Sequence, residues 1–118
     1  MKNLVLKNID IGADNPETYQ PDNPYNFSVS LTVLVGPSNQ EGGHLFQVCF
    51  CTLTWLAHQL SISKSITLRH MILIETFDFD IIQEKINEII ENSERETWDE
   101  SINVLSRYFF WEYEDFQV

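Results

Sequence analysis

Hydrophobic and polar residues follow two different periods, and the period changes near residue 75. In 27–35, FSVSLTVLV, every second residue is large and apolar, and mostly Ser or Thr stands between. Segment 44–51, HLFQVCFC, repeats this alternation. A period of two indicates strands with one buried and one solvated face, which is typical of antiparallel sheets. We expect these two segments to form a hairpin, joined by the loop 36–43 with its glycines and proline.

Three further segments favour extended structure. Residues 3–11 predict a first strand, and the loop 12–25 that follows contains three prolines. Residues 65–75 are rich in β-branched side chains and predict another strand. Aromatic and acidic residues alternate in 109–116, which fits either a final strand or an extended tail.

Apolar residues at spacings of three and four predict helices elsewhere in the chain. A short helix is expected over 52–60, with Leu53, Leu56 and Leu60 on one face. Two longer helices are expected over 80–93 and 97–109. Their inward residues are predicted to be Ile82, Ile86, Ile89, Ile90, Trp98, Ile102, Leu105 and Phe109.

Both long helices begin with a possible capping box, in which the cap and the residue three positions later satisfy unpaired amides. The pairs are Asp80 with Gln83 and Thr97 with Glu100. Together the patterns predict a single α+β domain over residues 1–118. Its sheet is antiparallel-rich with four to five strands, a short helix follows the hairpin, and the two C-terminal helices pack on one face.

Charge changes this picture, because it is concentrated at one end. The net charge is −11, and thirteen of the eighteen acidic residues lie between Glu75 and Val118, against three basic residues there. A local negative field attracts positively charged partners and repels nucleic acid and anionic lipid. We therefore expect a basic protein as partner, and neither nucleic acid nor membrane.

The candidate partner-binding residues follow from this field. The carboxylates would complement Lys and Arg of the partner, and one of two aromatic residues would be a buried anchor. A purely solvated helix face is the alternative for the acidic stripe. The candidate set is Glu84, Glu88, Glu91, Asp99, Trp111, Glu112, Tyr113, Glu114 and Asp115.

Catalytic and metal chemistry is weakly indicated. Cys49 and Cys51 stand two apart in a strand, where their Cα atoms are about 6.5–7 Å apart, at or beyond the limit for a disulfide. We interpret them as free, structural thiols in a reducing cytoplasm. With His44 and His58 they could form a zinc set, but the spacing matches no common zinc site. No cofactor, metal, signal peptide or membrane-spanning segment is expected, and the sequence leaves the oligomeric state open.

Three segments, 36–59, 69–86 and 97–116, resemble the immunity protein 8 family of bacterial polymorphic toxin systems. One departure is Leu53, where the family pattern has proline. The matching motifs are Gly36-Pro37, Cys51-Thr52, Trp55-Leu56, Arg69-His70, Phe77-Asp78, Leu105-Ser106-Arg107-Tyr108 and Trp111-Glu112-Tyr113-Glu114-Asp115.

The resemblance implies a small cytoplasmic protein that binds and neutralises a toxin domain without catalysis. Many such toxins are nucleases with basic clefts, which agrees with the acidic charge. Two alternatives stay open: an acidic adaptor or nucleic-acid mimic with no toxin partner, and a small enzyme that uses carboxylates or zinc.

Overall fold

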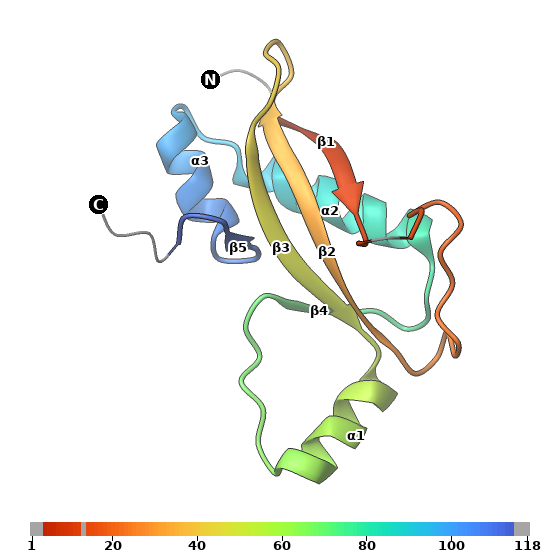
Figure 1. Ribbon diagram of the computed structural model, residues 1–118. Coiled ribbons are helices and arrows are strands. Elements are labelled where there is room, and N and C mark those ends of the chain that lie inside the picture. The colour runs from red at the N-terminus through yellow and green to blue at the C-terminus, as the bar shows by residue number, and fades with distance from the viewer. Residues whose placement is uncertain (1–3, 13, 115–118) are drawn as a thin grey trace.

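The predicted hairpin forms the centre of the molecule. In the computed structural model, which describes residues 4–12 and 14–114, β2 (Ser28–Pro37) and β3 (His44–Cys51) pair antiparallel along almost their whole length. Figure 1 shows them as two long, adjacent strands. Gly36 is required where the hairpin closes, because a Cβ there would collide with the backbone of Gly42. The alternating sequence pattern correctly predicted which side chains of these two strands are buried and which are exposed.

Three shorter strands complete a five-stranded mixed sheet. β1 (Leu4–Asp10) pairs antiparallel with the outer side of β2, with a bulge between Leu6 and Asn8. β4 (Met71–Leu73) pairs parallel with β3, and β5 (Phe110–Trp111) pairs antiparallel with the same strand. The sheet is mostly antiparallel, as predicted.

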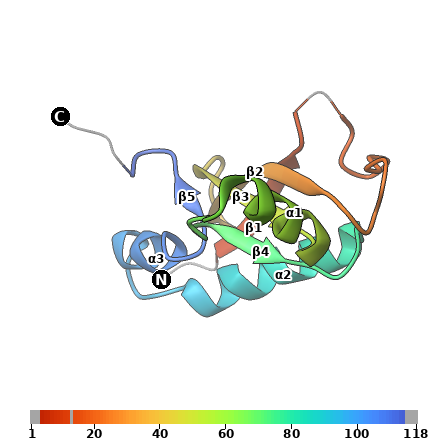
Figure 2. The same cartoon turned by 90° about the horizontal axis from the view of Figure 1, so that it is seen from below.

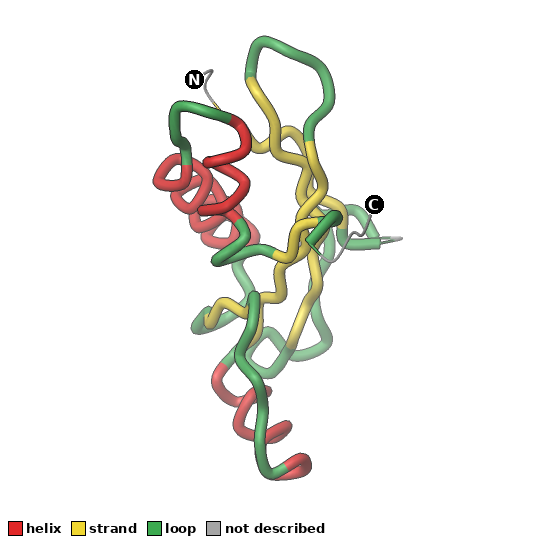
Figure 3. Tube along the Cα trace, turned by 90° about the vertical axis from the view of Figure 1, so that its left-hand side faces the viewer, coloured by secondary structure: helices red, strands yellow, loops and turns green. Residues whose placement is uncertain are grey.

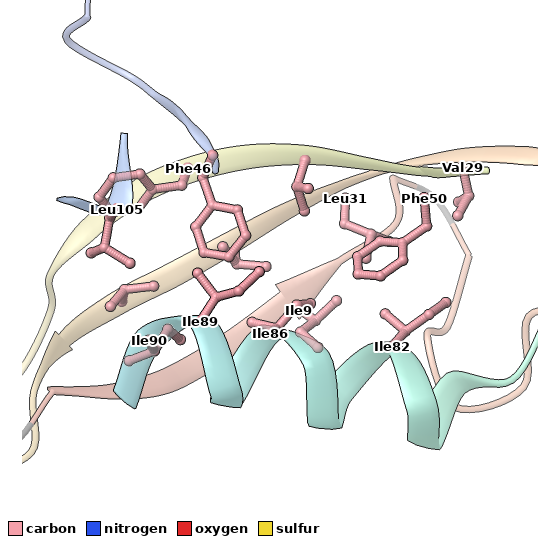
Figure 4. Close-up of a cluster of buried hydrophobic side chains, with 14 of the residues drawn as sticks. Ile9, Val29, Leu31, Phe46, Phe50, Ile82, Ile86, Ile89, Ile90 and Leu105 are labelled. Atoms are coloured by element: carbon pink, nitrogen blue, oxygen red, sulfur yellow. The ribbon is translucent and has the colours of Figure 1, made fainter. Parts of the chain in front are cut away.

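One face of the sheet is covered by α2 (Phe79–Ser93) and α3 (Trp98–Leu105), so the predicted α+β fold is confirmed. Figures 2 and 3 show both helices on the same side of the strands. The inner sheet face and α2 interdigitate in the core (Figure 4). Fully buried side chains there include Leu31, Val33, Val35, Phe46, Phe50, Ile82, Ile86, Ile90, Leu105 and Phe109.

The short helix differs most from expectation. α1 (Leu53–Ser63) forms, but none of its residues, all of them described, is buried. Of the three leucines expected on one face, Leu53 is 67% exposed and Leu60 is 47% exposed, whereas Leu56 is partly covered. The spacing correctly identified the helix, but no part of the sheet lies beside it: α1 extends past the end of the strands (Figures 1 and 3).

Three element boundaries also need correction. The predicted strand 65–75 is reduced to β4, because His70 takes a left-handed backbone with φ 57° just before it. Asp78, and not Asp80, caps α2, since its side chain accepts from the amides of Asp80 and Ile81 at 3.0 and 3.3 Å. α3 ends at Leu105, and the chain then turns so that Phe109 is still buried, as predicted.

Candidate functional site

The outward side of α2 carries the predicted acidic stripe. Glu84, Glu88 and Glu91 are all exposed, at spacings of four and three that place them on one face. Lys85 lies 3.5 Å from Glu88, but both side chains are well exposed, so this pair contributes little. Ile81, on the same side of the helix, is 48% exposed. These four residues, Ile81, Glu84, Glu88 and Glu91, are called the acidic face below.

The position of Glu91 is unfavourable for helix stability. It lies in the last turn of α2, where the helix dipole favours cations, and that turn contains no basic residue. The loop that follows continues with Glu94 and Glu96. Glu94 accepts from the amide of Leu4 at 2.6 Å and so has a structural role, but the helix dipole does not account for Glu91.

Asp99 lies on the adjacent helix. It is exposed in the first turn of α3, where the helix dipole favours a carboxylate. Thr97 caps this helix as predicted: its side chain accepts from the Glu100 amide at 3.1 Å and donates to the Glu100 carboxylate at 2.8 Å. Asp99 thus has a stabilising role available to it that Glu91 does not have.

The acidic residues after α3 make internal contacts. Glu112 accepts from the amide of Leu45 at 2.5 Å, which extends the pairing of β5 with β3. Glu114 is only 17% exposed, forms an ion pair with Arg69 and lies 3.7 Å from His70 Nε2. Asp115 lies outside the described residues. Glu112 and Glu114 therefore hold the C-terminal segment against the sheet, in addition to any role toward a partner.

Four aromatic rings gather where β3 begins. The His44 ring stacks on Trp111, at 5.7 Å between centroids, and meets Trp98 and Tyr113 edge to face. Trp111 Nε1 donates to His44 Nδ1 at 2.9 Å, whereas Trp98 Nε1 lies 3.4 Å from His44 Nε2. Trp111 is half-buried in this cluster and Tyr113 is 45% exposed beside it.

Three residues that belong to the site were not predicted as site residues from the sequence. His44 was considered only as a zinc ligand, although its alternation with Phe46 and Val48 already placed it on the inner face. Trp98 was assigned to the core alone. Ile81 gave a usable signal, since it is an apolar residue on the acidic side of a helix.

The two thiols have low reactivity. Both cysteines are free, as predicted. Burial raises the pKa of Cys49, although hydrogen bonding with the Ser28 side chain and the Val29 backbone opposes the shift. Burial, together with the neighbouring Cys49, raises the pKa of Cys51 to about 11. Both are therefore protonated at neutral pH and poor nucleophiles.

Other site types find little support in the part of the chain that the structure describes. No group of three or more His, Cys, Asp or Glu side chains there is arranged to hold a metal ion. His58 lies on α1, whereas His44 lies in the aromatic cluster, so the hypothetical zinc set is not assembled. Among the described helices, none has the length and apolar character needed to cross a bilayer.

Comparison with known proteins gives one match. The model of the family described as immunity protein 8 matches residues 4–116, nearly the whole chain. No curated protein and no solved structure matches it. Family membership implies a protein that neutralises a toxin. Because the match spans nearly the whole chain, the chain belongs to the immunity protein 8 family.

Proposed function

We propose that this immunity protein neutralises a basic, nuclease-type toxin domain by binding it one to one through the acidic face of α2, with Asp99 and the C-terminal aromatic cluster beside it. The exposed stripe of Glu84, Glu88 and Glu91 carries the proposal. Its carboxylates would pair with the Lys and Arg residues that bind phosphate groups in a nuclease cleft. The cleft would then be closed to its substrate.

The layout of the surface supports this mode of binding. Ile81 adds an exposed apolar side chain at the N-terminal end of the acidic stripe, and interfaces combine apolar and charged groups. Glu91 remains at a helix end where it opposes the dipole, so a role outside the folded chain would explain its presence. Stoichiometric binding needs no catalysis, and the protonated thiols agree with that. The cytoplasm is the proposed compartment, because two thiols stay reduced there.

Association kinetics test the acidic face. The partner is the toxin domain encoded next to this protein, and association is measured at low salt and at physiological salt for the wild type and for Glu84/Glu88/Glu91→Lys. Asp14/Glu17/Asp22→Lys, also three exposed acidic residues, is the matched control with the same total charge. We expect the α2 variant to associate much more slowly at low salt, and the control to stay near wild type.

Two outcomes would contradict this assignment. If both variants slow equally, only total charge matters and the location is wrong. If the α2 variant associates as fast as wild type, the stripe is a solvated face, and the interface must lie elsewhere, for instance in the loop 12–25.

Tyr113 is the proposed aromatic anchor. Its ring sits edge to face against His44 and Trp111, so it is held in place while 45% of it remains exposed. Tyr113→Ala is expected to speed dissociation and weaken binding by about 2 kcal/mol, the size of a typical hot spot. Tyr113→Phe should retain most of the affinity. Equal dissociation rates for wild type and Tyr113→Ala would exclude the anchor.

A further inference from the structure

The pair Arg69 and His70 lies immediately before β4 and has no part in the binding surface described above. The His70 carbonyl accepts from the Cys49 amide at 3.0 Å, which fixes the backbone of the pair to β3. His70 has a left-handed backbone, with φ 57°, which is uncommon for residues other than glycine. Such a conformation persists only where its surroundings hold it, and it often marks a functional position.

Both side chains reach the C-terminal segment, because β4 and β5 lie along the same edge of β3 (Figure 2). The ring of Phe110 meets His70 edge to face, at 5.8 Å between centroids, and the Arg69 guanidinium lies 5.9 Å from its centre. Glu114 Oε2 accepts from Arg69, and Glu114 Oε1 lies 3.7 Å from His70 Nε2. The two contacted residues stand on either side of Tyr113. Arg69 and His70 are called the clamp below.

The C-terminal segment needs this support, because its own secondary structure is short. β5 has only two residues, and the Glu112 amide adds one bond to the Leu45 carbonyl, at 3.1 Å. Residues 108–118 contain three acidic residues and no Lys or Arg, in a chain with a net charge of −11. Like charges repel, so the rest of the chain pushes this segment away. Arg69 supplies a cation that pairs with it.

Burial makes the contacts at Glu114 stronger than those of an exposed ion pair. The His70 side chain is 9% exposed, and its two ring nitrogens and Glu114 Oε1 are buried. Within the described part of the chain, none of these three atoms has a hydrogen-bond partner. A ring with hydrogen on Nε2 donates to Oε1 once the gap of 3.7 Å closes slightly, which pairs one buried atom on each side.

We propose that Arg69 and His70 are positioning residues, which clamp the chain at Phe110 and Glu114 and so fix Tyr113 between them for the partner. Arg69 contributes a charge and a planar group over a ring, and His70 contributes a buried donor. The role toward the toxin rests on the proposed function. The clamp itself is a property of the free protein and is tested there.

Amide hydrogen exchange of the free protein, measured by NMR, tests the clamp. Glu112 is the reporter, because its amide bond to the Leu45 carbonyl opens when the segment detaches from β3. Thr52, whose amide donates to the Phe27 carbonyl at 3.1 Å, is the reference for the rest of the sheet.

Arg69→Gln removes the charge of the clamp, and His70→Gly removes its ring, while glycine keeps the left-handed backbone without strain. Each variant should speed exchange at Glu112 about tenfold and leave exchange at Thr52 unchanged. Lys64→Gly is the matched control. Lys64 also lies between α1 and β4, has a left-handed φ of 69° and carries the same charge as Arg69. Its replacement should leave exchange at Glu112 at the wild-type rate.

A double-mutant cycle separates the ion pair from a general loss of packing. Glu114→Gln removes the partner of Arg69, so adding it to Arg69→Gln should speed exchange little further. Added to Lys64→Gly, it should have its full effect. Equal effects in the two backgrounds would show that Arg69 and Glu114 act separately, and would overturn the clamp. Unchanged exchange at Glu112 in both single variants, or equal acceleration at Thr52, would also overturn it.

Toxin dissociation then tests the positioning role. Arg69→Gln and His70→Gly should both speed dissociation, as Tyr113→Ala does, and Lys64→Gly should not. If only Tyr113→Ala speeds dissociation, the clamp does not position the anchor. If Tyr113→Ala itself dissociates like the wild type, the proposed anchor fails and the positioning role with it, whereas the exchange result still decides whether the clamp holds the segment.

Discussion

Thr97 shows how much one side chain can contribute to an element. Its hydroxyl oxygen accepts from the Glu100 amide while the hydroxyl donates to the Glu100 carboxylate. Thr97→Ala removes both bonds at the start of α3 and should lower the free energy of unfolding by about 1 kcal/mol, measured by urea denaturation. Thr97→Ser keeps the hydroxyl and serves as the control. Equal losses in the two variants would mean that the methyl group, and not the cap, matters.

Cys51 makes stability sensitive to alkaline pH. Its pKa is about 11 in the folded chain and about 9.0 when unperturbed, so the unfolded chain releases the thiol proton first. The contribution of this group is complete below pH ~9 and is lost as pH rises toward ~11. Thermal melts at several pH values should show the difference between wild type and Cys51→Ala shrinking across this window. A difference that stays constant from pH 8 to pH 11 would contradict the shift.

Single residues also mark the limit of sequence reasoning about the site. Exposure of Glu84, Glu88 and Glu91 follows from helical period alone, so it was predictable. The engagement of Glu114 by Arg69 was not, because these residues are 45 positions apart and meet only through the pairing of β4 and β5 with β3. The contact between His44 and Trp98 also joins residues far apart in the sequence, so it could not be predicted either.

At the scale of elements, α2 has acidic residues at both ends with opposite consequences. Asp80 lies in its first turn, where the dipole favours it, and Glu91 lies in the last turn, where the dipole opposes it. Glu91→Gln should therefore raise the free energy of unfolding by about 0.3–1 kcal/mol, and Asp80→Asn should lower it by a similar amount. Denaturation at low ionic strength measures both, and changes of the same sign would contradict this explanation.

Whether a β-prone segment becomes a strand depends on the sheet edge left for it. Residues 65–75 have strand-forming composition, yet only Met71–Leu73 pair, opposite Cys49–Cys51. The next part of the same edge, Phe46 and Gln47, is taken by β5. In a similar way, the helical period of the apolar residues identified α1 but could not show which elements pack against it. The local sequence pattern thus predicted whether most elements are helices or strands, while competition for shared surfaces decided how many residues each element includes.

At the scale of the whole molecule, the net charge of −11 acts against folding, because like charges concentrated after residue 75 repel each other in the compact state. Adding NaCl up to ~0.1 M, where the screening length falls to ~10 Å, should raise the melting temperature. Glu84/Glu88/Glu91→Gln should show a smaller rise. If the melting temperature rises equally with NaCl concentration in the two proteins, the repulsion does not come from Glu84, Glu88 and Glu91.

The shared edge of β3 has a consequence for biosynthesis. Its two halves are closed by β4 and β5, and β5 comes from residues 110–111, which the ribosome adds after both C-terminal helices. Until then the groups around Phe46 and Gln47 form an open strand edge, able to pair with another nascent chain. The two-residue strand β5 therefore covers the last open part of the β3 edge and protects it from aggregation. Translation that stalls before Phe110 should release chains that aggregate, although their β2–β3 hairpin has formed.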